Sequence, residues 1–210
     1  MKAAKDFFSE VERERIELAV QQAEKHTSGE IVPMVVDESY DYPQAEILGA
    51  GFFSLAAAVS LSWACFDESL WHFLWLFALC YFPFKLLIRN LPWLRRRLVH
   101  PVEINEEVTE MAIISFMQQG LHHTRDETGI LILISLFERR VHVLADRGIN
   151  AVVPADYWDG IVETITEGIH RGDTCTALCL AIETCGRLLE EHFPLKADDT
   201  NELSNNLVIG

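Results

Sequence analysis

Two long apolar runs, separated by three polar residues, constrain the fold of this chain more than any other feature. Residues 47–66 include no charged residue, and residues 70–88 include only Lys85. At about 1.5 Å of rise per residue, each run forms a helix of roughly 30 Å, the thickness of the hydrocarbon core of a bilayer. Because only Asp67-Glu68-Ser69 lies between them, the two helices are predicted to be antiparallel and to form a transmembrane hairpin.

Basic residues crowd the exit of the second run, whereas the short loop is acidic. Lys85 and Arg89 lie at its end, and Arg95-Arg96-Arg97 follows. Positively charged flanks stay on the cytoplasmic side of a membrane, so we expect the loop outside and the rest of the chain in the cytoplasm, with the lipid bilayer as a partner. The alternative is a buried hairpin in a soluble protein, but both runs are apolar all round and lack the polar stripe of a surface helix.

Composition limits what the rest of the chain can do. Of the 210 residues, the hairpin and its flank take about a quarter, which leaves enough for one ordinary domain. The formal net charge is -15, so the soluble part is strongly acidic, which argues against nucleic acid as a partner and permits divalent cations or basic proteins. The five cysteines include no Cys-x-x-Cys pair and are interpreted as reduced packing thiols. The N-terminus lacks a signal-peptide core, so the first transmembrane helix is expected to be an uncleaved anchor.

Periodicity predicts helices and strands on both sides of the hairpin. Ser9 and Glu12 form a capping box at the start of a helix that ends near Lys25. In the strand that follows, Pro33 requires an edge position, or a missing donor that faces away from the neighbouring strand. The other elements are a helix over 103–119, a buried strand over 130–134, a returning strand over 140–144, and two helices between Pro154 and Pro194.

This order predicts an α/β sandwich interrupted by a two-helix transmembrane hairpin. A strand–helix–strand unit favours parallel pairing through a right-handed crossover, so sequence from both sides of the hairpin must complete one sheet. The predicted boundaries are 1–44 for the first part of a cytoplasmic domain, 45–99 for the hairpin with its basic flank, and 100–194 for the second part of the domain. Residues 195–210 are predicted to be a mobile acidic tail.

Four short segments, in this order and at this spacing, are similar to the TPM domain, a small α/β family that carries a phosphatase label. They are Thr27-Ser28-Gly29-Glu30-Ile31, Thr128-Gly129-Ile130-Leu131-Ile132-Leu133, the stretch from Glu138-Arg139-Arg140-Val141 to Asp146-Arg147-Gly148-Ile149, and Arg171-Gly172-Asp173. The resemblance covers roughly residues 6–37 and 103–194. It is nearest to the bacterial membrane-protein branch of the family.

The resemblance implies a TPM-like sandwich at the bacterial inner (cytoplasmic) membrane and, from the family label, metal-dependent action on phosphate esters or phosphoproteins. This chain departs from the pattern at two places. Glu127-Thr128-Gly129 stands where many members have Asp-Asn-Gly before the central strand. Ala145-Asp146-Arg147-Gly148 stands where many have a glycine-rich turn.

The predicted strand directions bring four carboxylates to one end of the sheet, beside Arg147. They are Glu30, Asp126, Glu127 and Asp146. Carboxylates from separate segments can coordinate a hard cation such as Ca²⁺ or Mg²⁺, and through it act on a phosphate ester. The alternative is a solvated acidic rim, because neither an EF-hand loop nor another tight ligand spacing is present. No organic cofactor is indicated.

Other candidate groups have ordinary explanations beside the functional ones. At the opposite end of the sheet, Asp37, Glu38, Glu138 and Arg139 can gather in the same way, and either Arg139 or Arg140 is expected to pair with a nearby carboxylate. His122-His123 is a conceivable transition-metal site, but without a second ligand pair at proper spacing solvent-exposed histidines are favoured. Nucleophile signatures such as Gly-x-Ser-x-Gly and Cys-x5-Arg are missing from the sequence.

Two functions therefore compete. The acidic surface and the missing nucleophile signature favour a membrane-anchored regulatory or protein-interaction module, with other membrane proteins as partners and a divalent cation as a candidate ligand. The alternative is a metal-dependent phosphatase, which the acidic cluster and the family label support.

Overall fold

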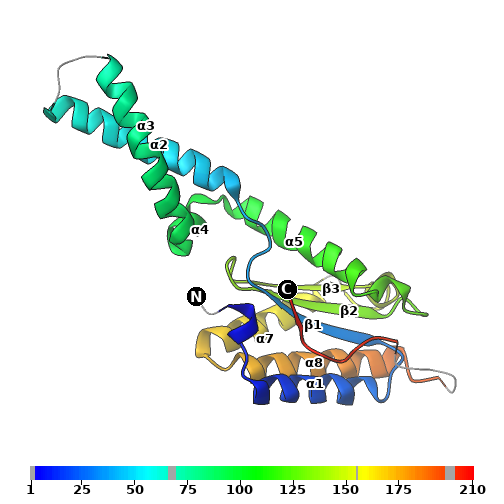
Figure 1. Ribbon diagram of the computed structural model, residues 1–210. Helices are drawn as coiled ribbons and strands as arrows, with labels where there is room; N and C mark the ends of the chain where they lie inside the picture. Colours follow the sequence, from blue (N-terminus) through cyan, green and yellow to red (C-terminus); the bar gives the residue numbers. More distant parts are fainter. Residues whose placement is uncertain (1–2, 66–69, 155, 197–201) are drawn as a thin grey trace. The chain divides into compact units, whose positions relative to one another are not determined.

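The computed structural model describes residues 3–65, 70–154, 156–196 and 202–210. The chain divides into two units. Met1–Ser39 and Glu106–Gly210 form the first, which we call the α/β unit, and Tyr40–Asn105 forms the second, which we call the helical unit. Figure 1 shows that the helical unit is inserted between the two sequence segments that build the α/β unit.

The α/β unit is built on a four-stranded mixed sheet with the strand order β3-β2-β1-β4. The central pair, β1 (Glu30–Val36) and β2 (Gly129–Ser135), is parallel, with Glu30 opposite Gly129. β3 (Arg140–Ala145) runs antiparallel to β2, and β4 (Val208–Ile209) runs parallel to β1. The predicted directions of the first three strands and the α/β fold class with a helical hairpin are confirmed.

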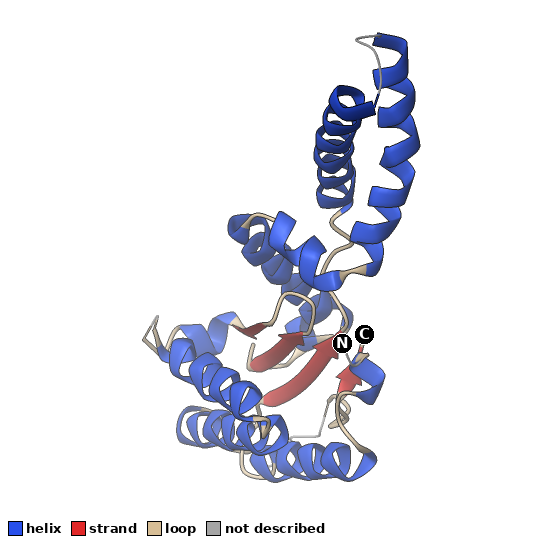
Figure 2. Cartoon of the chain, turned by 90° about the vertical axis from the view of Figure 1, so that its left-hand side faces the viewer, coloured by secondary structure: helices blue, strands red, loops and turns tan. Residues whose placement is uncertain are grey.

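Helices cover both faces of this sheet (Figure 2). Ile130, Ile132 and Ile134 of β2 face one core, which contains residues of α1 (Glu10–Glu24), α7 (Tyr157–Arg171) and α8 (Thr174–His192). Leu131 and Leu133 face the other core with Val108, Ala112 and Phe116 of α5 (Pro101–Gln118). Because alternate side chains of a strand point to opposite faces, this continuous apolar run is buried on both sides, as predicted. The described part of the unit also contains three short helices: η1 (Ala4–Asp6), η2 (Leu121–His123) and α6 (Arg147–Asn150).

The prediction of a mobile tail over 195–210 is corrected for its last residues, because β4 pairs with the free edge of β1. Gly210 donates its backbone N–H to the carbonyl of Val35 at 3.0 Å, and Leu207 is buried in the core beneath the sheet. Leu207, Val208 and Ile209 are apolar residues in a polar segment: Val208 and Ile209 pair with β1, and Leu207 is buried.

Pro33 lies in a strand with a neighbour on each side, and its missing N–H faces away from β2, which is the second of the two arrangements predicted for it. Backbone groups two residues apart in a strand point to the same side, so Pro33 has the orientation of Val35, whose carbonyl faces β4. The missing N–H therefore points away from β2, and the ladder between β1 and β2 runs without interruption from Glu30 to Val36.

The helical unit consists of α2 (Pro43–Cys65), α3 (Leu70–Asn90) and α4 (Pro92–Leu98). α2 and α3 are antiparallel and pack along each other (Figure 1). Ala50, Ser54 and Ala58, four residues apart on α2, are fully buried, and such small side chains let two helices approach closely. The predicted loop Asp67-Glu68-Ser69 lies outside the described residues.

Both helices of the hairpin are long and apolar enough to cross a bilayer, and they fit a two-pass membrane protein. Their outer surfaces are apolar and exposed, which suits contact with lipid rather than with water. The large exposed side chains include Phe52, Val59, Trp63, Trp71, Trp75, Leu79 and Phe82. In the same unit the basic flank folds back on α2, where the Arg95 guanidinium lies 3.9 Å from the Glu46 carboxylate.

Candidate functional site

The parallel pairing of β1 and β2 places the four predicted cation ligands at one end of the sheet, which we call the acidic end. Glu30 begins β1 opposite Gly129, and the Asp126–Glu127 segment leads into β2. Asp146 follows β3 and donates its backbone N–H to the carbonyl of Gly129 at 2.9 Å. The backbone of this end is close-packed, since a Cβ added to Gly148 would lie 2.7 Å from the carbonyl oxygens of both Asp126 and Glu127.

Two of these carboxylates are held by basic side chains. The Lys196 ammonium lies 2.7 Å from both carboxylate oxygens of Asp126. The Arg147 guanidinium binds Glu127 in bidentate fashion, at 2.9 Å through Nε and 2.6 Å through Nη2. Hydrogen bonding to Arg147 lowers the pKa of Glu127, which therefore stays ionised at neutral pH. A cation that bound here would have to displace Lys196 and Arg147.

Asp146 caps the short helix α6, and its two carboxylate oxygens differ. Oδ1 accepts the backbone N–H of Arg147 at 2.7 Å, whereas Oδ2 is buried and has no hydrogen-bond partner among the residues that the structure describes. A buried oxygen of this kind normally has a partner, so Asp146 Oδ2 is available to a ligand. Within the described ranges, however, no group of three or more His, Cys, Asp or Glu side chains is arranged to hold a metal ion.

Glu30 belongs to a second carboxylate pair, with Glu24, that sequence reasoning missed. Burial raises the pKa of Glu24 to about 8; the backbone N–H of Ile31, 2.8 Å from Oε1, opposes this rise, and the neighbouring Glu30 adds to it. The C-terminal segment closes over the pair, because the backbone N–H of Glu202 lies 2.9 Å from Glu30 Oε1 and Asn205 donates its amide to Glu24. An acidic residue at the C-terminal end of α1, where the helix dipole disfavours it, is the one signal in the sequence.

The pair His122-His123 lies in η2 and is exposed, with its two rings 3.8 Å apart. At the opposite end of the sheet, Glu138 is fully buried and accepts the backbone N–H of Ser39 at 2.9 Å and the hydroxyl of Ser135. The expectation that Arg139 or Arg140 pairs with a nearby carboxylate is wrong for the part of the chain that is described. Glu138 is buried and accepts hydrogen bonds from Ser39 and Ser135, whereas both arginines are exposed.

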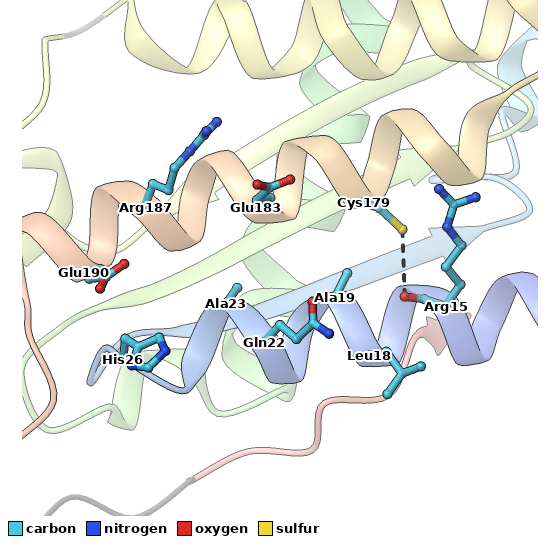
Figure 3. A pocket seen from close by; sticks show the side chains of 10 residues that line it. All are labelled: Arg15, Leu18, Ala19, Gln22, Ala23, His26, Cys179, Glu183, Arg187 and Glu190. Atoms are coloured by element: carbon cyan, nitrogen blue, oxygen red, sulfur yellow. Dashed lines mark hydrogen bonds between the residues drawn. The ribbon is translucent and has the colours of Figure 1, made fainter.

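A groove of about 510 Å³ lies between α1 and α8 on the side away from the sheet (Figure 3). α1 contributes Arg15, Leu18, Ala19, Gln22, Ala23 and His26, and α8 contributes Cys179, Glu183, Arg187 and Glu190. Both signs of charge alternate along α8, and Leu18 is 55% exposed at the rim of the groove. The groove therefore combines an exposed apolar side chain with charged side chains of both signs.

The cysteines of α8 do not have the properties of nucleophiles. Burial raises the pKa of Cys175 to about 11, and it also raises the pKa of Cys179 and of Cys185. Since the thiolate is the reactive form, these thiols are protonated and unreactive at neutral pH. They are packing residues, and the thiol of Cys179 also lies 3.9 Å from the carbonyl oxygen of Arg15 across the groove (Figure 3).

Residues 98–188 match the family profile of the TPM domain. Among solved structures, the chain is similar to the NMR structure of the BA42 protein from the psychrophilic bacterium Bizionia argentinensis, with a TM-score of 0.61 and 22% sequence identity. That alignment covers 97% of this chain and 96% of the other, and at this identity it supports the fold alone. No curated protein matches the sequence.

Proposed function

Residues 98–188 match a TPM domain, which confirms the predicted resemblance, and from that premise we propose that this protein is a membrane-anchored interaction module. The hairpin holds the α/β unit at the cytoplasmic face of the membrane, and the groove between α1 and α8 binds cytoplasmic segments of other membrane proteins. The groove is the observation that carries this proposal, because it combines an exposed apolar side chain with ordered charges of both signs.

The charges of the groove define the partner that would fit it. Acidic side chains of the partner would pair with Arg15 and Arg187, and basic side chains would pair with Glu183 and Glu190. An apolar residue of the partner would contact Leu18. An amphipathic helix with this alternation would meet the requirement, since helices present apolar and charged residues at fixed intervals to a groove. Charge complementarity would then give specificity more than affinity.

A divalent cation at the acidic end is the regulatory part of the proposal. Ca²⁺ or Mg²⁺ would bind Asp126, Glu127 and Asp146, with Glu30 beside them, and would use the unpartnered Oδ2 of Asp146. It would release Lys196, the last described residue before the segment 202–210 that closes over Glu30 and Glu24. Cation binding would thereby influence how the C-terminal segment 202–210 contacts Glu30 and Glu24.

The interaction proposal is tested by charge reversal in the groove. The full-length protein is purified from native membranes with its bound proteins, beside Arg187→Glu and the control Arg140→Glu, which makes the same change of charge on the exposed part of β3. Proteins retained by the parent and the control, and lost from Arg187→Glu, support the groove. An unchanged set of bound proteins in Arg187→Glu would contradict the proposal that the groove binds partner proteins.

The alternative, a metal-dependent phosphatase, rests on the same acidic end. It requires a nucleophile or a general acid near the cation, and the pKa values of the thiols in α8 are raised rather than lowered. Turnover of a generic phosphate ester that is abolished by Asp126→Asn together with Asp146→Asn would favour this alternative over the interaction module.

A further inference from the structure

A second cavity, about 390 Å³ in volume, lies at the end of the sheet opposite to the acidic end. It is bounded by the turn between β2 and β3, by α7, and by the segment after η1. Most of its lining is apolar, from Phe7, Ile134, Leu136, Val141 and Ile169. Cavities of this volume with apolar walls and a few polar groups are typical of small-molecule sites.

The polar residues of the lining are Ser135, whose hydroxyl donates to Glu138, and three further residues with donor side chains: Arg139, Thr166 and His170. Over the described ranges, none of these three side chains makes an ion pair or a hydrogen bond. Two other threonines, Thr164 and Thr184, donate to the carbonyl four residues before them, at 2.8 Å each, and Thr166 differs from both in this respect.

Two acidic side chains at this end of the sheet, Asp37 and Glu138, accept hydrogen bonds from other groups. Asp37 accepts the backbone N–H of Ala4 at 2.6 Å, and the buried Glu138 accepts that of Ser39. Neither of them is among the residues described as lining the cavity, and none of the lining residues is acidic. The cavity therefore presents positive and neutral donors to its interior without an internal counter-ion.

The backbone conformation of Arg139 indicates that its side chain has a function other than forming the turn between β2 and β3. Arg139 has a φ of 52°, in the left-handed region that glycine adopts far more easily than arginine. A hairpin turn alone would favour glycine or asparagine there. The chain instead has a cationic residue at this unfavourable position, and that residue lines the cavity.

We propose that this cavity binds a small amphipathic anion. The apolar body packs among Phe7, Ile134 and Ile169, and a carboxylate or phosphate head is held by Arg139 and His170 with Thr166 as a further donor. Arginine suits this role because its planar fork of donors matches a carboxylate or a phosphate in bidentate geometry. The site is distinct from both the acidic end and the groove between α1 and α8.

The test uses the full-length protein in lipid nanodiscs and isothermal titration calorimetry, with empty nanodiscs as the reference for partition into lipid. Butanoate, hexanoate and octanoate are titrated beside acetate, hexanol and hexyl phosphate. We expect saturable binding of one alkyl carboxylate per chain, with an affinity that rises about fourfold for each added methylene that the cavity buries. Hexanol and acetate should bind at least tenfold more weakly than octanoate, and hexyl phosphate shows which head group is preferred.

Chain length also separates two sources of such a ligand. Dodecanoate is therefore titrated as well. An affinity that stops rising near six carbons indicates a soluble metabolite, and one that rises further to dodecanoate indicates an acyl chain derived from lipid. Either result supports the site. Heat equal to that of empty nanodiscs, or equal affinity for octanoate and hexanol, would overturn the proposal.

Arg139→Gly is the decisive variant, because glycine removes the charge and suits the left-handed turn, so the hairpin is expected to fold. It should weaken octanoate binding at least tenfold. Arg140→Ala, which removes the same charge from a neighbouring residue outside the cavity, should leave binding within a factor of two. Unaltered binding in Arg139→Gly, with unaltered hydrogen exchange of β2 and β3, would show that Arg139 does not hold an anion.

Discussion

The ammonium of Lys196 lies 2.7 Å from both carboxylate oxygens of Asp126, across 70 positions of sequence. This lysine follows the last helix, whereas Asp126 precedes the central strand, so the contact joins two distant parts of the chain at the acidic end. A side-chain cation thus occupies the place where the sequence predicts an inorganic one.

If a divalent cation binds the acidic end, Lys196 competes with it. Lys196→Met should therefore increase the rise in melting temperature that millimolar Ca²⁺ or Mg²⁺ produces, because binding to the native state alone stabilises it. Asp126→Asn together with Asp146→Asn should abolish the rise. The measurement is the thermal unfolding of the detergent-solubilised protein with and without cation. Equal melting temperatures in all samples would mean that these carboxylates form a solvated rim that does not bind the cation.

The raised pKa of Glu24 predicts that the α/β unit loses stability as the pH rises. With a folded pKa of about 8 and an ordinary value of 4.5, the native state keeps a proton that the unfolded chain has already released between these two values. The contribution of Glu24 to the free energy of unfolding is therefore fully present below about pH 4.5 and is lost as the pH rises to about 8. Glu24→Gln is neutral at every pH, so its stability relative to the parent should increase across this window.

Hydrogen exchange of the β1 amides at pH 5, 7 and 8.5 measures this effect, after correction for the intrinsic exchange rates. Glu14→Gln, an exposed glutamate on the same helix, is the matched control and should follow the parent. Parallel pH profiles for Glu24→Gln and the parent would mean that Glu24 is already ionised at neutral pH.

Two glycines of α7 should respond to alanine in opposite directions. A Cβ on Gly168 would lie 2.1 Å from the Cβ of Ala177 on α8, so Gly168→Ala should destabilise the α/β unit by about 1–3 kcal/mol through overpacking. Gly160 has no atom within 4 Å of its added Cβ, and Gly160→Ala should stabilise the unit by about 0.5–1 kcal/mol through helix propensity. Chemical denaturation followed by far-UV circular dichroism distinguishes them. Equal effects would contradict the close approach of α7 and α8.

The membrane topology is tested by reporter fusions. A reporter after Gly210 should be active only in the cytoplasm, and one inserted at Glu68 only outside, because the arginines after the second helix hold that end inside. Replacing Arg95, Arg96 and Arg97 by glutamine should weaken this preference. An external signal from the fusion at Gly210 would reverse the orientation of the α/β unit.

Much of the fold could be predicted because the decisive signals are local. The apolar runs determine the lengths of α2 and α3, the capping box of Ser9 and Glu12 determines the start of α1, and the continuous apolar run of β2 determines its burial on both faces. The directions of β1, β2 and β3 followed from the order of the elements and the handedness of crossovers. These features depend on near neighbours in sequence and on the solvent that each segment requires.

The tertiary structure alone decided which side chains meet. The partners of the predicted carboxylates are Lys196, Arg147 and the backbone of Glu202, and the sequence contains no spacing rule that links such distant positions. The same holds for the burial of Glu138, for the pairing of β4 with β1, and for the cavity beside Arg139. Periodicity determines which face of an element is apolar, but the pKa, the partner and the exposure of a polar group depend on what the rest of the chain places next to it.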